Sequence, residues 1–235
     1  VIQVIETFRP DIIVNRFSHN TPGTTHGHHT ASAMLSLEAY DLVKYKPKRI
    51  FFNTSWWFYG SQEAFDAADK SKLLAINSNV FYPLKGKSNN EIAALSRSQH
   101  KCQGFGTLGT RGDEIEYLEL LKGDVRRNNN LFEGIDTSWN RVKGGNEIGK
   151  ILYDVEKNFN FGNPSVHIQN LMKAYDLIQK LEDSHWKEIK SKQIIKIIEA
   201  CSGLFMEAVA DTETTTKDSN FNINIEVINR SQSNA

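Results

Sequence analysis

The chain has 235 residues, of which 39% are hydrophobic and 24% charged, a composition typical of folded globular protein. Basic and acidic residues both number 28, so the formal net charge is zero and gives no electrostatic basis for binding nucleic acid or an anionic membrane. The sequence contains no apolar run of about 18 residues, so it predicts no transmembrane segment, and its two distant cysteines form no CxxC motif.

The first half of the chain alternates between helical and strand patterns. Apolar residues at helical spacing predict helices over residues 1–8, 25–45 and 90–101. Short apolar or alternating runs predict strands over residues 12–14, 50–53, 73–80 and 115–121. This alternation, with short connections, predicts an α/β fold with a Rossmann-like, doubly wound parallel sheet. In such sheets ligands bind beyond the carboxyl ends of the strands.

The pattern changes after about residue 144. Three amphipathic stretches predict helices over residues 148–159, 166–181 and 186–209. A Thr-rich polar segment follows, and strict alternation over residues 221–227 predicts a half-buried strand, which cannot stand alone. We therefore expect an α/β domain over residues 1–143, a helical extension over residues 144–210, and a linker with the first strand of a β-sandwich module over residues 211–235.

A histidine cluster lies where the first predicted strand leads into the second helix. His26 and His29 are three residues apart at the expected helix start, with Thr25 or Thr24 as its cap, so both imidazoles would share one face. Neutral imidazole is a common zinc ligand, and the helix N-terminus favours the neutral form by lowering the histidine pKa. The same spacing also suits exposed histidines without a ligand, and His28 between them could be a solvated bystander.

The residues around this cluster resemble a block of the PIG-L/LmbE family of zinc-dependent de-N-acetylases. Residues 9–14 read R-P-D followed by the strand, and residues 26–31 begin H-G-H-H, where the family has H-P-D-H at a helix start. The resemblance implies that His29 is a zinc ligand and that His26 stabilises the oxyanion or protonates the leaving amine. His28 replaces the family's aspartate, and we expect it to orient His26 as a neutral hydrogen-bond acceptor.

A second block supports the same resemblance. His100 begins the string H-K-C-Q, which is similar to the family's H-x-S-Q, with Cys102 replacing serine. The resemblance implies that His100 faces the substrate, whereas a histidine at a helix C-terminus can instead satisfy free carbonyl groups. The strings at residues 22–26 and 88–93 are similar to large multi-domain bacterial members. Together these blocks cover about residues 1–110.

The family's first block, A-H-P-D-D-E, is absent from the 235 residues. In the family it supplies two further zinc ligands and the general base, so we expect the chain to be inactive alone. We interpret the start at Val1, inside a helical pattern, as internal to a longer protein. The remaining ligands would then come from a preceding N-terminal segment or from a separate chain carrying it.

The resemblance implies hydrolysis of an N-acetyl group by zinc-activated water. The implied substrate is a small molecule or glycan that carries an N-acetylated amino sugar. The alternative is a non-catalytic carbohydrate-binding or scaffold protein that retains the fold without the chemistry.

Three further groups of residues have two interpretations each. Arg16, directly after the first strand, could contact a substrate phosphate or carboxylate, or form a surface salt bridge. The aromatic residues 56–59 could form a stacking wall for a sugar ring, but we expect two or more of them in the core. Acidic residues Asp113, Glu114 and Glu116 are interpreted as a solvated loop.

Overall fold

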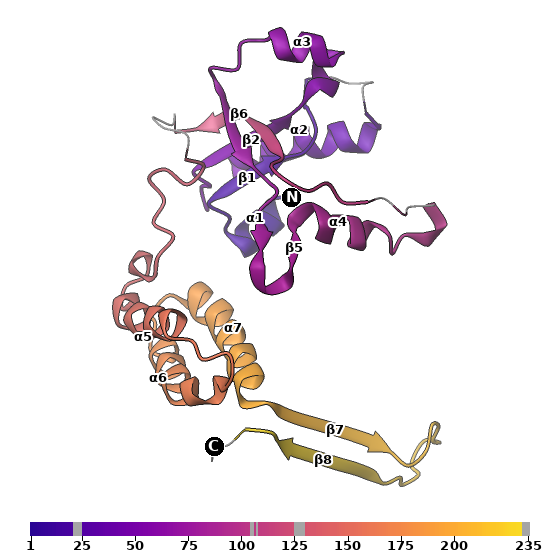
Figure 1. Ribbon diagram of the computed structural model, residues 1–235, viewed down its shortest axis with the longest axis vertical. Helices are drawn as coiled ribbons and strands as arrows, with labels where there is room; N and C mark the ends of the chain where they lie inside the picture. Colours follow the sequence, from indigo (N-terminus) through magenta and orange to yellow (C-terminus); the bar gives the residue numbers. More distant parts are fainter. Residues whose placement is uncertain (21–24, 104–105, 107, 125–129, 232–235) are drawn as a thin grey trace. The chain divides into compact units, whose positions relative to one another are not determined.

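The computed structural model describes residues 1–20, 25–103, 106, 108–124 and 130–231. The chain divides into two compact units, Val1–Ile135 and Asp136–Ala235 (Figure 1). Each unit has hydrophobic clusters of its own, which are made by residues of that unit alone. None of the described helices is both long enough and apolar enough to cross a membrane.

The first unit is built on a four-stranded sheet with the order β1-β2-β6-β3 (Figure 1). The strands are β1 (Ile12–Asn15), β2 (Arg49–Thr54), β3 (Leu73–Asn77) and β6 (Ile115–Gly123). β1 and β2 are parallel, as the crossover through a helix requires, whereas β6 runs antiparallel to both of its neighbours. The predicted α/β class is confirmed. The prediction of a parallel sheet is wrong, because β6 lies between β2 and β3 and runs antiparallel to both, which makes the sheet mixed.

Helix α2 (Gly27–Leu42) connects β1 to β2 and packs through small side chains. Its buried residues recur every third position: Thr30, Ala33, Ser36 and Ala39. Asn15, the last residue of β1, fixes this helix to the sheet. Its amide nitrogen donates to the Ala33 carbonyl at 3.4 Å, and its amide oxygen accepts from the Ser36 hydroxyl at 2.6 Å. The end of β1 and the start of α2 are therefore held in one position.

Strand β2 is buried along its whole length. Phe51 packs with Leu74 of β3 and Leu118 of β6 in the sheet's main hydrophobic cluster. Arg49, only 3% exposed, donates to the carbonyl oxygens of residues 124, 131 and 133, and its guanidinium lies 3.5 Å from the Asp124 carboxylate. A buried cation with all these partners ties the segment after β6 to the sheet.

Shorter elements complete the first unit. They are α1 (Ile2–Phe8), η1 (Trp56–Tyr59), α3 (Gln62–Ala67), β4 (Phe81–Tyr82), η2 (Pro83–Lys85), β5 (Lys87–Ser88), α4 (Asn89–Arg97) and η3 (Lys101–Gln103). Ser88 begins α4 with a capping box: its hydroxyl accepts from the Glu91 N–H, and the Glu91 carboxylate accepts from the Ser88 N–H.

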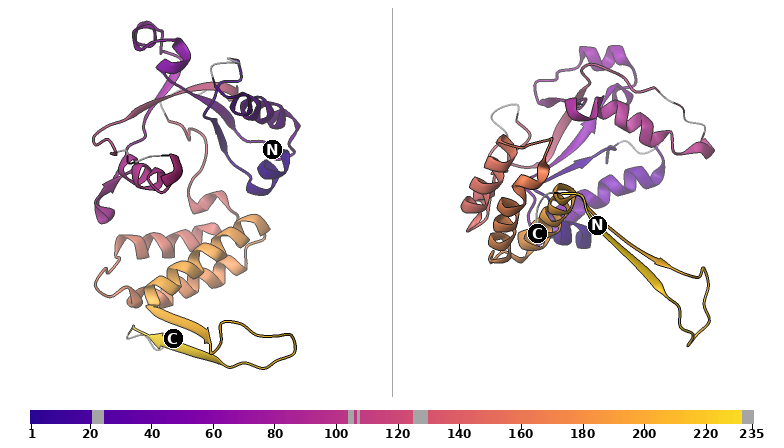
Figure 2. Two further views of the ribbon diagram at one scale, coloured as in Figure 1. Left: turned by 90° about the vertical axis from the view of Figure 1, so that its right-hand side faces the viewer. Right: turned by 60° about the horizontal axis from the view of Figure 1, so that its bottom comes forward.

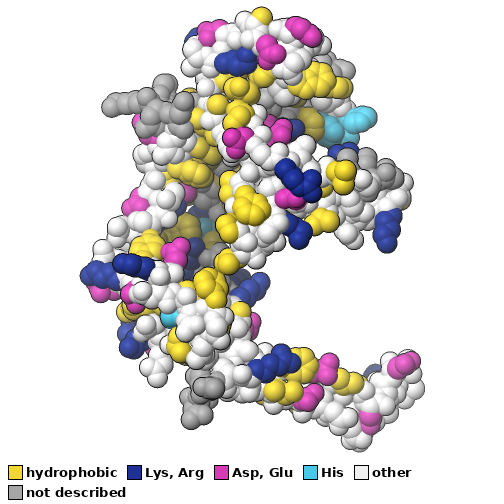
Figure 3. Space-filling view, in the orientation of Figure 1, with side chains coloured by type: hydrophobic (Ala, Val, Ile, Leu, Met, Phe, Trp, Pro, Cys, Tyr) yellow, Lys and Arg dark blue, Asp and Glu magenta, His cyan; other side chains and the backbone are white. Residues whose placement is uncertain are grey.

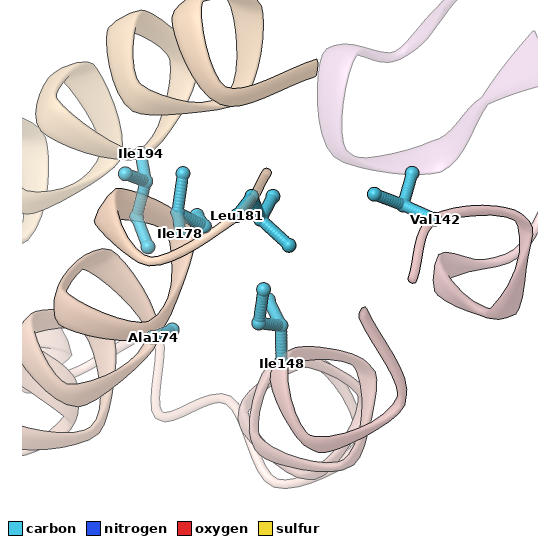
Figure 4. Close-up of a cluster of buried hydrophobic side chains, with 6 residues drawn as sticks. All are labelled: Val142, Ile148, Ala174, Ile178, Leu181 and Ile194. Atoms are coloured by element: carbon cyan, nitrogen blue, oxygen red, sulfur yellow. The ribbon is translucent and has the colours of Figure 1, made fainter. Parts of the chain in front are cut away.

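The second unit contains the three predicted helices. They are α5 (Gly145–Lys157), α6 (Ile168–Gln179) and α7 (Ser184–Ser202), with the short turns η4 (Trp139–Arg141) and η5 (Pro164–His167). Figure 4 shows their main core cluster, in which Ile148 of α5, Ile178 of α6 and Ile194 of α7 point toward one another. Amphipathic spacing thus identified each helix.

The prediction of a helix as far as residue 209 is wrong. α7 ends at Ser202 because Gly203 adopts a left-handed conformation (φ 60°), which commonly terminates helices. The chain continues as β7 (Leu204–Ala210), which pairs antiparallel with β8 (Ile223–Asn229), as Figure 2 shows. The predicted final strand therefore has a partner within this chain, and its membership of a β-sandwich stays a prediction.

Candidate functional site

A cavity of about 630 Å³ lies beyond the carboxyl ends of β1 and β2. Three short segments line it: the residues after β1, the start of α2, and the residues after β2. The lining side chains are Arg16, Phe17, Thr25, His26, His29, Ser55, Trp56, Trp57 and Phe58. Histidine side chains gather on one side of the first unit in the space-filling view (Figure 3). The structure thus brings together Arg16, His26 and His29, which sequence reasoning had singled out.

The three histidines at the start of α2 form a compact group. The ring centroids of His26 and His29 are 5.5 Å apart, and those of His28 and His29 are 4.2 Å apart, both pairs edge to face. The His26 and His28 rings are nearly parallel, with centroids 5.6 Å apart. The contact between His26 and His28 is thus ring stacking, and the orienting role of His28 stays a prediction.

The expectation that Thr25 caps α2 is wrong, and Thr24 lies outside the described residues. The N-cap is His26, whose extended backbone (φ −62°, ψ 144°) places its carbonyl to accept from the His29 and Thr30 N–H groups. The Thr25 hydroxyl lies 3.4 Å from the Thr30 hydroxyl instead. His26 therefore enters the cavity from the residue before the helix, and His29 from its first turn.

His29 is held in its neutral form by its surroundings. Its ring stacks on Phe17, with centroids 3.9 Å apart and planes 10° from parallel. Burial lowers the pKa of His29 below its usual value, and the neighbouring imidazoles of His28 and His26 lower it further. A neutral imidazole has a free nitrogen lone pair, which is the form that binds a metal.

Arg16 is positioned by a polar network at the same edge of the sheet. Its guanidinium donates to the side-chain oxygen of Asn53 and lies 3.6 Å from the Glu116 carboxylate. The Asn53 amide in turn donates to Glu116 at 2.8 Å and to the Tyr117 carbonyl at 3.2 Å. Arg16 therefore forms a salt bridge and also lines the cavity, so the two interpretations given as alternatives hold together. Glu116 is part of this network rather than of a solvated loop.

The aromatic segment after β2 forms a wall of the cavity. Trp56 and Trp57 are 46% and 54% exposed, and no residue of η1 is buried. The expectation that two or more of these aromatic residues belong to the core is therefore wrong. Phe58 packs edge to face on Phe52 of β2, and Tyr59 packs on Phe65 of α3, so this 3₁₀ turn rests on the core while the indoles of Trp56 and Trp57 stay exposed. Exposed indole rings beside polar groups are typical of carbohydrate-stacking surfaces.

The second sequence block does not reach this cavity. His100 lies three residues beyond the end of α4, is exposed, and is not among the side chains that line the cavity. Its N–H donates to the Arg97 carbonyl at 3.0 Å, a contact within the turn that ends the helix. Cys102 is an exposed free thiol. The substrate-facing role of His100 stays a prediction.

The residues at the cavity fit a zinc ion only in part. His29 offers an imidazole whose lowered pKa favours the neutral, ligating form, and the centroid of the His26 ring lies 5.5 Å from that of His29. Within the described ranges, no group of three or more His, Cys, Asp or Glu side chains is arranged to hold a metal. A catalytic zinc site normally has three protein ligands and an open position, so these residues supply part of such a site.

Comparisons of the chain with known protein families, with curated proteins and with solved structures find no match.

Proposed function

We propose that the chain carries part of the active site of a zinc-dependent N-deacetylase that removes an acetyl group from an amino sugar or its conjugate. The observation that carries the proposal is the convergence of His26, His29 and Arg16 on one cavity with an exposed indole wall. The resemblance to the PIG-L/LmbE block accounts for the same residues. Under this proposal the first unit is a Rossmann-like domain, and its parallel β1–α2–β2 segment positions the site.

His29 is assigned the role of zinc ligand. Its lowered pKa keeps it unprotonated near neutral pH, and its stacking on Phe17 fixes the ring direction. When bound, the zinc ion would polarise the acetamide carbonyl and activate a water molecule. The remaining ligands and the general base are assigned, as the resemblance implies, to a segment outside this sequence.

His26 is assigned the acid role. Water attack on the acetamide carbon forms a carbon–oxygen bond and places negative charge on the carbonyl oxygen. A protonated His26 would donate a hydrogen bond to that oxygen and then give its proton to the amine nitrogen as the carbon–nitrogen bond breaks. The products are acetate and the free amine.

Substrate binding is assigned to the rest of the cavity. Its volume, about 630 Å³, lies within the usual range of small-molecule sites, roughly 300–1,000 Å³. Trp56 and Trp57 would stack on the sugar ring, and Arg16, held by Asn53, would donate to a hydroxyl, phosphate or carboxylate of the substrate.

A second function is a carbohydrate-binding protein without catalysis. Two observations favour it: the exposed indole wall, and the incomplete set of metal ligands among the residues described. The two functions differ in what zinc does. A binding protein would bind N-acetylglucosamine equally well with and without zinc, whereas the enzyme would release acetate only with zinc.

Acetate release from N-acetylglucosamine by the whole natural protein, supplied with zinc, tests the proposal. We expect His26→Ala to lower kcat by about 10²–10³-fold, the usual cost of removing one group that stabilises the oxyanion. Its zinc content should remain that of the wild type. His185→Ala, which removes a histidine of the second unit, is the control and should keep the wild-type rate. A zinc-loaded wild type without acetate release, or an unaffected His26→Ala variant, contradicts the proposal.

A further inference from the structure

A second, smaller cavity lies wholly within the helical unit, between η4 and α7. Its volume is about 130 Å³, and its lining includes Trp139, Arg141, Trp186 and Lys190. The proposed deacetylase uses none of these residues. Two indole rings and two cations line this one small cavity, and Trp and Arg are residue types enriched where partners bind.

The cavity is built on the core of the unit. Val142, part of its lining, belongs to the buried cluster drawn in Figure 4, and both indole rings pack against that cluster. The backbone N–H of Trp139 donates to the Tyr153 hydroxyl at 3.2 Å. The Trp139 carbonyl lies so close to Gly145 that a β-carbon there would collide with it. These contacts fix the backbone of η4 at the wall of the cavity.

The positive charges lie over the aromatic faces. The Arg141 guanidinium carbon is 4.6 Å from the Trp186 ring centroid. The Lys190 ammonium is 5.6 Å from the Trp186 centroid and 5.7 Å from the Trp139 centroid. Each distance is within cation–π range, which holds the two cations near each other at the cavity.

Lys190 has no carboxylate partner among the described residues. Its ammonium donates to the Gln193 side-chain oxygen at 2.9 Å, a neutral acceptor. Burial lowers the pKa of Lys190, and the charge of Arg141 lowers it further. Half-buried positive charge beside a second cation costs free energy that a neutral amide offsets only in part.

Two carboxylates of the segments that flank the cavity accept hydrogen bonds from neighbouring residues. Asp136 accepts from the Ser138 hydroxyl at 2.6 Å and from the Ser138 N–H at 2.8 Å. Asp183 caps α7 by accepting from the N–H groups of His185 and Trp186. The hydrogen bonds from the Ser138 hydroxyl and N–H, and then the charge of Arg141, lower the pKa of Asp136, so this carboxylate is ionised.

We propose that this cavity binds an oxyanion, a carboxylate or sulfate group, with Lys190 as its main cationic contact. The oxyanion would pair with the Lys190 ammonium, and the organic body attached to it would contact the indole rings. The cavity has a volume of about 130 Å³, roughly that of four water molecules, which suits the charged group itself, so the rest of a larger ligand would lie outside it. The proposal does not depend on deacetylase activity.

The test uses the indole N–H signals of the full chain in nitrogen-labelled NMR spectra, assigned with Trp139→Phe and Trp186→Phe. The probes are sodium glucuronate, a carboxylate on a sugar, inorganic sulfate, a free oxyanion, and glucose, the uncharged match to glucuronate. We expect saturable shifts of the Trp139 and Trp186 signals with glucuronate or sulfate and none with glucose. The anion that binds more tightly shows whether the cavity takes a carboxylate carried on a sugar or a free oxyanion.

Variants of α7 separate binding from structure. Lys190→Gln should weaken anion binding about tenfold or more, because a charge-assisted contact is lost. Lys190→Arg should retain it. Lys192→Gln, which removes an exposed lysine paired with Glu188 on the same helix, is the matched control and should bind as the wild type does. The proposal is overturned if neither anion gives saturable shifts, if glucose gives the same shifts, or if Lys190→Gln binds undiminished while its spectrum remains that of a folded chain.

Discussion

His29 shows how three neighbouring side chains determine the state of one functional group. Phe17 covers one face of its ring, and the imidazoles of His28 and His26 lie close to it. Burial and these two neighbours all lower its pKa. A histidine on an exposed helix start would be partly protonated near pH 6.5, whereas His29 stays neutral down to a lower pH.

Removing the His28 imidazole should reverse part of the lowering of the His29 pKa. We expect His28→Gln to raise the pKa of His29 toward 6.5, because the variant removes one of the two imidazoles whose electrostatic effect lowers it. In the wild type the neutral, metal-binding form should persist below pH 6.5 and disappear as the pH falls through the lowered pKa. NMR titration of the His29 ring protons measures both values. A titration midpoint for His29 at or above pH 6.5 in the wild type would refute the lowered pKa.

At the scale of elements, the sheet depends on a close approach between β2 and β6. The register of the pair shifts between Ile50 and Phe51. Gly123, the last residue of β6, pairs with Arg49 and has a positive φ of 110°. A β-carbon at this glycine would collide with the Lys48 carbonyl oxygen. The shift lets β6 keep its apolar side chains on the core while its end turns toward the buried Arg49.

The variant Gly123→Ala should therefore destabilise the first unit strongly. We expect a loss of about 2–4 kcal/mol in the free energy of unfolding, from backbone strain together with the collision. Gly60→Ala is the matched control: φ is also positive (87°), but nothing lies within 4 Å of the added carbon. That variant should lose only about 1 kcal/mol. Urea unfolding of both variants gives the comparison, and equal losses would show that the close approach does not matter.

Several helices and strands of the first unit could be predicted from sequence, because the residue pattern that specifies each of them lies within the element itself. The apolar run before Asn15, the start of the helix at the histidines and the buried run of β2 each fall within a few residues. The antiparallel direction of β6 could not be predicted, because a strand's own pattern does not specify its neighbours. The end of α7 had a local signal in Gly203 that the apolar periodicity outweighed.

The candidate site was predictable only in part for the same reason. His26 and His29 are close in sequence, so the local structure at the start of α2 brings them together, although His26 precedes the helix as its N-cap. The network of Arg16, Asn53 and Glu116 joins residues 37 and 63 positions apart, and only the paired strands bring them together. Trp56 and Trp57 stay exposed while the adjacent Phe58 and Tyr59 pack on buried rings, a division that sequence spacing does not reveal.

At the scale of the molecule, the two units should unfold as separate cooperative blocks. Each has a core of its own, and the second is centred on the fully buried Ile148. Cys201 is buried in this unit, where burial raises the pKa of its thiol, whereas Cys102 is exposed in the first. The labelling rate of Cys201 therefore reports opening of the second unit alone.

Ile148→Ala should destabilise the second unit by about 2–5 kcal/mol through the cavity it creates. Labelling of Cys201 should then accelerate by at least about thirtyfold, while labelling of Cys102 stays unchanged. Ile197→Ala, at an exposed position of α7, is the control and should have little effect on either thiol. Equal acceleration at both cysteines would indicate a single cooperative block.

The central claim, that His29 is a zinc ligand, is tested most directly by the metal content of the whole natural protein. We expect about one equivalent of zinc in the purified wild type, and its loss in His29→Ala, because a site of three protein ligands cannot retain zinc stoichiometrically with one removed. His185→Ala should keep the full equivalent. Stoichiometric zinc in His29→Ala would contradict the claim.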